Sequence, residues 1–189
     1  MPSLAPANGP FESRAASVAS LRDVVAVLAT AVALAVLSNV LIPLPFTPVP
    51  ISLATFGVLA AAGTLGPVRA GAGAAFFLLG GIAGIPWFAG EGMGWSFPTF
   101  GYIVGYVLAA VVVGALVRRR TDGRALPLMG AMLVGSSIIY LTGAPWLMLS
   151  LGVGVSEAFQ MGVLPFLIGD ALKSLAAAGI TYGAFQLRR

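Results

Sequence analysis

The chain has 189 residues, of which 59% are hydrophobic and only 8% are charged, and its mean hydropathy is +1.00. Soluble domains carry about 25% charged residues, so this composition excludes a soluble enzyme and predicts a membrane protein. The sequence contains no cysteine and no histidine, which excludes disulfides, thiolate or histidine metal sites and Ser-His-Asp triads.

The first twenty residues are rich in proline, serine and alanine and are expected to form a mobile tail, with residues 21–189 as a single domain. The first membrane span is predicted at 24–42. The stretch from Pro43 to Pro50 contains four prolines, which are incompatible with a helix interior. This stretch is therefore predicted to be a rigid, extended connector.

Further spans are predicted wherever a predominantly apolar stretch approaches the 20 or so residues that cross a bilayer. Residues 146–155 are apolar but too few to cross, which favours an interfacial or re-entrant helix. The expected fold class is therefore all-α, a bundle of six transmembrane helices with a short interfacial helix between the fifth and sixth. The remaining spans are 51–65, 70–85, 98–117, 126–142 and 161–187.

The charges support this count of spans. Six spans place both ends of the chain on one side of the membrane, and the loops on the other side carry only Glu91 and Glu157. Basic residues mark the cytoplasmic side, so both termini are expected in the cytoplasm, with the arginines beside anionic lipid rather than nucleic acid. The cations on that side are Arg14, Arg22, Arg69, Arg118, Arg119, Arg120, Arg124, Arg188 and Arg189.

Alanines recur at four-residue spacing on the first span, as Ala29 with Ala33 and Ala31 with Ala35. Small residues at this spacing clear one face of a helix, so that a neighbouring backbone can approach closely. Two interpretations stay open at this point. The alanines pack the helix inside its own bundle, or they form a docking face for another membrane subunit.

Asp170 and Lys173 lie inside the sixth span. A charge near the middle of a membrane costs at least about 2.5 kcal/mol, and residues three apart share one helix face. The pair is therefore either a structural ion pair or a polar anchor for a small ligand. A mixed pair both donates and accepts hydrogen bonds, as an amide-like or ureido-like group requires.

Enzymatic alternatives lack the residues that they need. Lys173-Ser174 would fit a phosphate-binding loop only with glycine at position 172, which is leucine. Asp170 is the one acid predicted inside a span. We therefore expect a binding protein that has no catalytic residues, no metal and no cofactor of its own.

Aromatic residues flank the outer ends of the third, fourth and fifth spans. They form either an interfacial aromatic belt or the walls of a cavity for a small, mostly apolar molecule. Glycines 90, 92 and 94 make the loop among them pliable. The aromatic residues are Trp87, Phe88, Trp95, Phe97, Tyr102, Tyr106, Tyr140 and Trp146.

Three ordered segments resemble the signatures of the biotin-specific substrate-binding subunits (BioY, S components) of energy-coupling factor transporters. The first is PFTPVPIS at 45–52, after the first span. The second combines GIPWFAG at 84–90 with PTFGY at 98–102, and the third is PFLIGDALK at 165–173. The resemblance runs from about residue 24 to the C-terminus, and the three motifs together are specific.

The resemblance implies a six-helix subunit in the cell (inner) membrane of a prokaryote that captures biotin from outside. It implies that Asp170 and Lys173 contact the polar part of biotin and that the aromatic loop encloses its ring. Energy would come from a separate membrane coupling subunit and two cytoplasmic ATPases, with the alanine face of the first helix docking to the coupling subunit. The further expected ligand-binding residues are Thr47, Trp87, Phe88, Tyr102 and Tyr140.

The sequence departs from the family pattern at four positions. Ala54 stands where glutamine is usual, which removes a ligand hydrogen bond, and Glu91, Phe97 and Phe100 stand where glycine is common. The two phenylalanines are expected to shrink or reshape the pocket. The alternatives are a substrate-binding subunit for another vitamin, thiamine or riboflavin, and a self-sufficient secondary transporter. Secondary transporters often show inverted repeats, for which the two halves of this sequence offer no convincing pairing.

Overall fold

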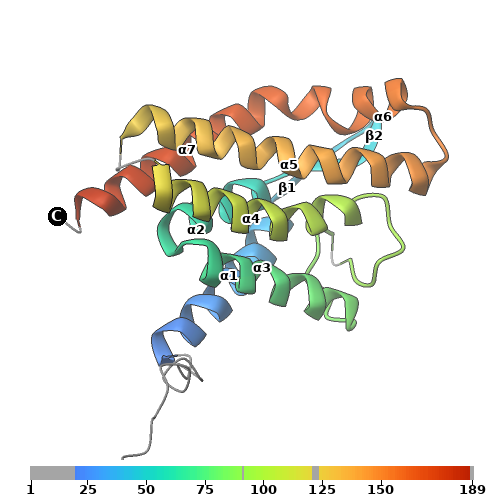
Figure 1. Ribbon diagram of the computed structural model, residues 1–189. Helices are drawn as coiled ribbons and strands as arrows, with labels where there is room; N and C mark the ends of the chain where they lie inside the picture. Colours follow the sequence, from blue (N-terminus) through green and yellow to red (C-terminus); the bar gives the residue numbers. More distant parts are fainter. Residues whose placement is uncertain (1–19, 91, 121–123, 188–189) are drawn as a thin grey trace, which may run out of the picture.

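The computed structural model describes residues 20–90, 92–120 and 124–187 (Figure 1). Nearly all of the predicted tail at 1–20 therefore lies outside the described residues, as does Glu91. Helices make up most of the chain. The elements are α1 (Leu21–Asn39), β1 (Leu41–Leu44), β2 (Thr47–Ser52), α2 (Ala54–Leu65), α3 (Pro67–Ile82), α4 (Phe100–Arg120), α5 (Ala125–Leu151), α6 (Val155–Gly162), the 3-10 turn η2 (Leu164–Phe166) and α7 (Leu167–Gln186).

Four stretches of the described residues are long and apolar enough to cross a membrane. They are α1, α4, α5 and the combined stretch Val155–Gln186. The helices α2 and α3 are apolar but shorter. The prediction of a multi-pass membrane protein is therefore confirmed, whereas the count of six spans remains a prediction.

The starts of α1 and α3 follow from local sequence. The backbone N–H of Asp23 donates to the Ser20 hydroxyl (3.3 Å), and the N–H of Ser20 donates to the Asp23 carboxylate (3.1 Å). This reciprocal pair is a capping box. Gly66, at a φ of 83°, ends α2, and Pro67 takes the first position of α3, where its missing N–H costs nothing.

The connector after α1 is a β-hairpin, which corrects the all-α prediction. Strands β1 and β2 pair antiparallel, with Leu41 opposite Ser52 and Leu44 opposite Thr47. The extended conformation was predicted correctly, but the pairing was not. Proline is tolerated at the edge of a sheet, and in a two-stranded sheet both strands are edges, so the prolines do not prevent the ladder.

The fifth span is longer than predicted, because α5 continues through Pro145 to Leu151. A proline inside a helix removes one backbone hydrogen bond. Contacts with α4 and with the loop before it support this path, since Gly143 leaves room for the ring of Tyr102 and the indole N–H of Trp146 donates to the carbonyl of Phe97 (2.9 Å). The separate helix predicted at 146–155 is therefore wrong.

A short helix does precede the last span, but it is α6 at Val155–Gly162. Gly152, with a φ of 68°, ends α5 in the left-handed conformation that glycine adopts readily. The sixth predicted span at 161–187 divides into the end of α6, the turn η2 that contains Pro165, and α7. The predicted span therefore lies almost wholly within the apolar stretch Val155–Gln186, but it is not one continuous helix.

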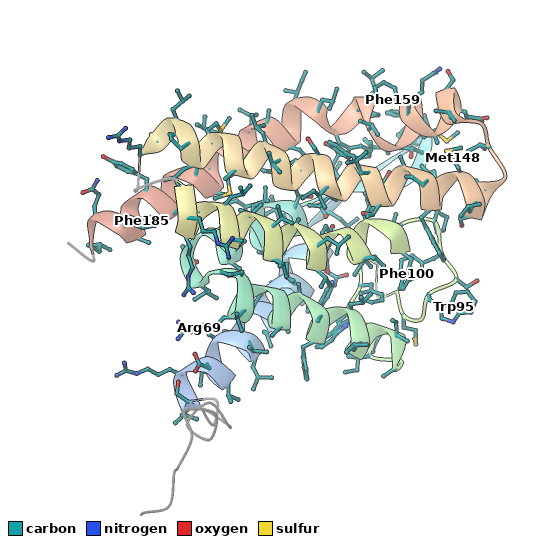
Figure 2. All side chains as sticks on the ribbon, viewed as in Figure 1. Arg69, Trp95, Phe100, Met148, Phe159 and Phe185 are labelled. Carbon is teal, nitrogen blue, oxygen red and sulfur yellow. The ribbon has the colours of Figure 1, made fainter. Side chains whose placement is uncertain are left out.

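The helices α4, α5 and α7 lie side by side along the long axis, and α1 packs against α3 on the other side of α4 (Figure 1). Figure 2 shows Trp95, Phe100, Met148 and Phe159 at one end of the bundle, and Arg69 and Phe185 at the other. We call these the aromatic end and the arginine end. The hairpin, the loop before α4 and α6 lie toward the aromatic end.

Candidate functional site

A cavity lies between the hairpin, α2, α4, α5 and α7. It encloses about 610 Å³ of space free of protein atoms, including its open mouth. Apolar side chains form much of its lining, and a cluster of hydroxyls and one ion pair form the rest. The polar lining residues are Ser38, Ser52, Thr55, Thr99, Tyr102, Tyr106, Tyr140, Asp170 and Lys173, and the apolar ones are Val49, Pro50, Phe77, Ala89, Ile103, Ile139 and Phe166.

The ion pair joins two residues of α7 within this cavity. Lys173 Nζ lies 2.8 Å from Asp170 Oδ1, and the Tyr140 hydroxyl donates to Asp170 Oδ2 at 2.5 Å. The side chains of Lys173 and Asp170 are only 12% and 8% exposed. Both carboxylate oxygens therefore have a partner, and the lysine offsets the cost of burying the acid.

Asp170 also lies in the first turn of α7. The positive end of a helix dipole favours a carboxylate at that position. The helix, the lysine and the tyrosine thus hold a charged group at a depth where an unpaired charge would be unstable. The cluster offers a ligand both hydrogen-bond donors and acceptors.

Two further tyrosines from α4 reach the same cavity. The Tyr102 hydroxyl donates to the carbonyl of Gly162 (2.8 Å), which connects α4 to α6. The Tyr106 hydroxyl lies within hydrogen-bonding reach of Ser52 and Thr55. Ser52, Thr55 and Tyr106 were not among the predicted ligand-binding residues, although Thr55 directly follows the departure at Ala54 and Ser52 lies two residues before it. The sequence signal that could have identified Ser52 and Thr55 is their spacing, two hydroxyl residues three positions apart at the start of an apolar helix.

Trp87 and Phe88, which we expected to enclose the ligand, pack behind the cavity wall. The indole N–H of Trp87 donates to the carbonyl of Phe77 (2.8 Å). Phe88 is completely buried, with its ring centre 5.1 Å from that of Phe77 and its edge over the bare backbone of Gly81. Of these rings, Phe77 itself lines the cavity.

Thr47 lies outside the cavity lining as well. Its hydroxyl donates to the carbonyl of Met161 (3.0 Å) and accepts from the N–H of Val49 (3.2 Å). It therefore fastens the hairpin to α6. Val49 and Pro50, the next residues of the same motif, do line the cavity.

The two phenylalanine departures form a row of rings beside the cavity. Phe97 packs between Phe88 and Phe100, at centroid distances of 5.7 and 5.9 Å, and Phe100 in turn contacts Trp146 at 5.2 Å. Neither Phe97 nor Phe100 lines the cavity. They extend the aromatic packing that holds the loop before α4 against α4 and α5.

The four alanines of α1 do not share one environment. Ala31 is fully buried in the core, and Ala35 is half-buried against it. Ala29 and Ala33 are exposed, one turn apart. Only the pair Ala29/Ala33 is therefore open to another chain in this structure.

Comparisons with known proteins show that this chain is similar to members of one protein family. The model of the BioY family matches residues 12–189. A "Probable biotin transporter BioY" of Pyrococcus horikoshii is 35% identical over 69% of this chain and 76% of its own length. A "Biotin transporter BioY" of Rhizobium etli is 32% identical over 72% of this chain and 78% of its own.

The fold has a counterpart among solved structures. A crystal structure of the S-component for biotin from an ECF-type ABC transporter superposes with a TM-score of 0.79, over 88% of this chain and 90% of that one. The identity between the two chains is 23%. The agreement at this low identity shows that this chain shares the overall fold of that S-component.

Proposed function

The chain belongs to the BioY family, and from that premise we propose that it is the membrane-embedded, biotin-binding subunit of a vitamin uptake system. The observation that carries this proposal is the cavity that contains Asp170, Lys173 and Tyr140. A buried site with one mixed ion pair and apolar walls fits a small, largely apolar molecule with a polar group that meets the pair.

Biotin matches both parts of the lining. Its ureido group has one carbonyl acceptor and two N–H donors, so Lys173 would donate to the carbonyl while Asp170 accepts from an N–H. Its fused ring system would pack against Val49, Phe77 and Ile103, which line the same cavity. The hydroxyls of Tyr106 and its neighbours would satisfy the remaining polar atoms.

Competition binding tests this proposal directly. Purified protein is loaded with labelled biotin and then challenged with a hundredfold excess of unlabelled biotin, thiamine or riboflavin. We expect only biotin to displace the label. Displacement by thiamine or riboflavin, or failure to bind biotin at all, would contradict the assignment and favour a subunit for another vitamin.

The proposal includes six membrane crossings with both termini in the cytoplasm, where α2 and α3 are short crossings joined by the tight turn at Gly66-Pro67. Arg69 and Arg118 lie together at one end of the bundle, as basic cytoplasmic ends require. Tags at positions 1 and 189 should both resist external protease. Cleavage of the C-terminal tag from outside would overturn this topology.

We further propose that α1 docks to a membrane coupling subunit, which two cytoplasmic ATPases energise. The exposed pair Ala29/Ala33 supports this, since small residues one turn apart permit close helix contact. Replacing both with leucine should reduce cellular uptake about tenfold and leave biotin binding by the purified subunit unchanged. Ala176→Leu, at an exposed site on α7, is the control and should reduce neither.

Equal loss of uptake and binding in the Ala29/Ala33 variant would show instead that these alanines pack the bundle. Uptake by the subunit alone, with no ATPase and no ATP, would favour a self-sufficient secondary transporter.

A further inference from the structure

A second hollow lies at the arginine end, between the first turns of α1 and α3 and the last turn of α4. It encloses about 1220 Å³ of space, including its open side. We call it the α1–α3 groove. Asp23, Arg69 and Arg118 line its polar end, and Leu28, Ala72 and Phe76 are among its apolar lining. None of these residues belongs to the biotin cavity.

The polar end carries an excess of positive charge. Nε of Arg69 lies 2.5 Å from Asp23 Oδ1, and the two terminal nitrogens of its guanidinium provide further donors. Arg118 brings a second guanidinium, and Asp23 is the one acid in the lining. Two cations against one carboxylate leave a net positive site.

The position of Arg118 depends on the glycines of the turn between α2 and α3. A Cβ at Gly66 would lie 2.6 Å from Arg118 Nε, and a Cβ at Gly114 would lie 2.5 Å from the backbone nitrogen of Pro67. Because neither glycine has a side chain, the end of α4 lies directly against this turn. This packing places the guanidinium of Arg118 at the polar end of the groove.

The other end of the groove is apolar and lies at the surface of the bundle. Leu28 and Phe76 are 44% and 46% exposed. From Arg69 to Phe76 the helix α3 advances about 10 Å, at roughly 1.5 Å per residue. The groove therefore changes from cationic to apolar over a length that matches the headgroup region and the upper part of an acyl chain.

We propose that the α1–α3 groove binds an anionic phospholipid, with its phosphate between Arg69 and Arg118 and an acyl chain along Leu28, Ala72 and Phe76. Arginine suits this role because its planar donors match phosphate oxygens. A free phosphate ion would use the polar end alone, and a zwitterionic lipid would not neutralise the excess positive charge. The proposal does not depend on the ligand of the other cavity.

Native mass spectrometry of the purified full chain tests the proposal. The protein is incubated with phosphatidylglycerol or phosphatidylcholine of identical acyl chains, and the retained lipid is counted. We expect preferential retention of phosphatidylglycerol, weakened about tenfold or more in the double variant Arg69→Gln/Arg118→Gln. The control Arg119→Gln/Arg124→Gln removes the same charge from exposed positions outside the groove and should retain the lipid as the parent does.

A second variant tests the apolar end. Ala72→Trp keeps every charge and fills the groove from an exposed position, so it should weaken retention of phosphatidylglycerol while eluting as a monodisperse protein. Inorganic phosphate, added as a competitor, should not displace the lipid. Equal retention of the two lipids by the parent, equal loss in both double variants, or displacement by phosphate would each overturn the proposal.

Discussion

We expected both the ion pair on α7 and the aromatic loop before α4 to contact the ligand. The two differ in where the structure places their side chains. Asp170 and Lys173 line the cavity with Tyr140. Trp87 and Phe88, from the loop, pack against Phe77 instead and support the wall from behind.

The difference follows from the cost of each residue type. A buried ion pair stabilises little by itself against apolar side chains of similar volume, so its presence in an apolar span indicates a use beyond packing. An aromatic ring is stable in a core, at an interface and in a ligand pocket alike. Charge in a span is therefore the sharper indicator of a binding site, and aromatic residues need the structure to assign them.

Truncating Phe88 should give the largest effect, and it should be on stability. Removing a buried phenylalanine ring costs about 3 to 5 kcal/mol, so Phe88→Ala should lower the thermal midpoint strongly while the folded fraction binds biotin within a few-fold of the parent. Phe159→Ala, at a half-exposed ring on α6, is the matched control. Loss of biotin binding without loss of stability would show instead that Phe88 contacts the ligand.

Neutralising Asp170 should affect binding instead. Removing one partner of a buried charge pair costs about 2 to 5 kcal/mol of binding free energy, which is roughly 30- to 4,000-fold in affinity. Asp170→Asn should therefore abolish tight biotin binding in a calorimetric titration of folded protein. Glu157→Gln, at an exposed acid on α6, should bind normally.

The double variant Asp170→Asn/Lys173→Met separates ligand binding from structural locking. If the pair only locks the helices, Asp170→Asn leaves Lys173 buried and unpaired, and the second change should restore stability and binding together. We expect stability to return and binding to stay lost. A double variant that binds biotin as tightly as its parent would contradict the assignment of the pair.

The smallest of these effects is expected from Tyr140→Phe. The change removes the hydrogen bond to Asp170 Oδ2, and hydrogen bonds to charged groups contribute about 1.5 kcal/mol or more, so affinity should fall roughly tenfold in the same titration. Tyr182→Phe, on the exposed face of α7, serves as control. Unchanged affinity in Tyr140→Phe would confine the ligand contact to the ion pair itself.

Helix formation could be predicted wherever it depends on local residues. The capping box at Ser20 and the proline after Gly66 place the starts of α1 and α3 within a few residues. The hairpin and the full length of α5 could not be predicted, since both depend on distant partners. The path of α5 through Pro145 depends on contacts with Phe97 and Tyr102, more than forty residues away in the chain.

The residues of the candidate site also differ in how well the sequence alone identifies them. Asp170 and Lys173 could be selected because charge stands out in an apolar helix. Ser52, Thr55 and Tyr106 stood out less than the charges did. A threonine hydroxyl in a helix can also bond to its own backbone, as Thr64 does through the carbonyl of Ala60, and a tyrosine fits an interfacial aromatic belt as well as a cavity wall. Only the folded arrangement of the hairpin, α2 and α4 shows that these three hydroxyls meet at one cavity.

The pairing of Asp170 with Lys173 has an electrical consequence. Moving one elementary charge across a membrane potential of 100 mV involves about 2.3 kcal/mol of work. The two groups carry opposite charges 2.8 Å apart on one helix, so when they move together the work on one cancels the work on the other. Voltage therefore exerts almost no net force on the pair. The carboxylate of biotin is then the charge that responds to voltage, and any current measured during capture should report the ligand rather than the protein.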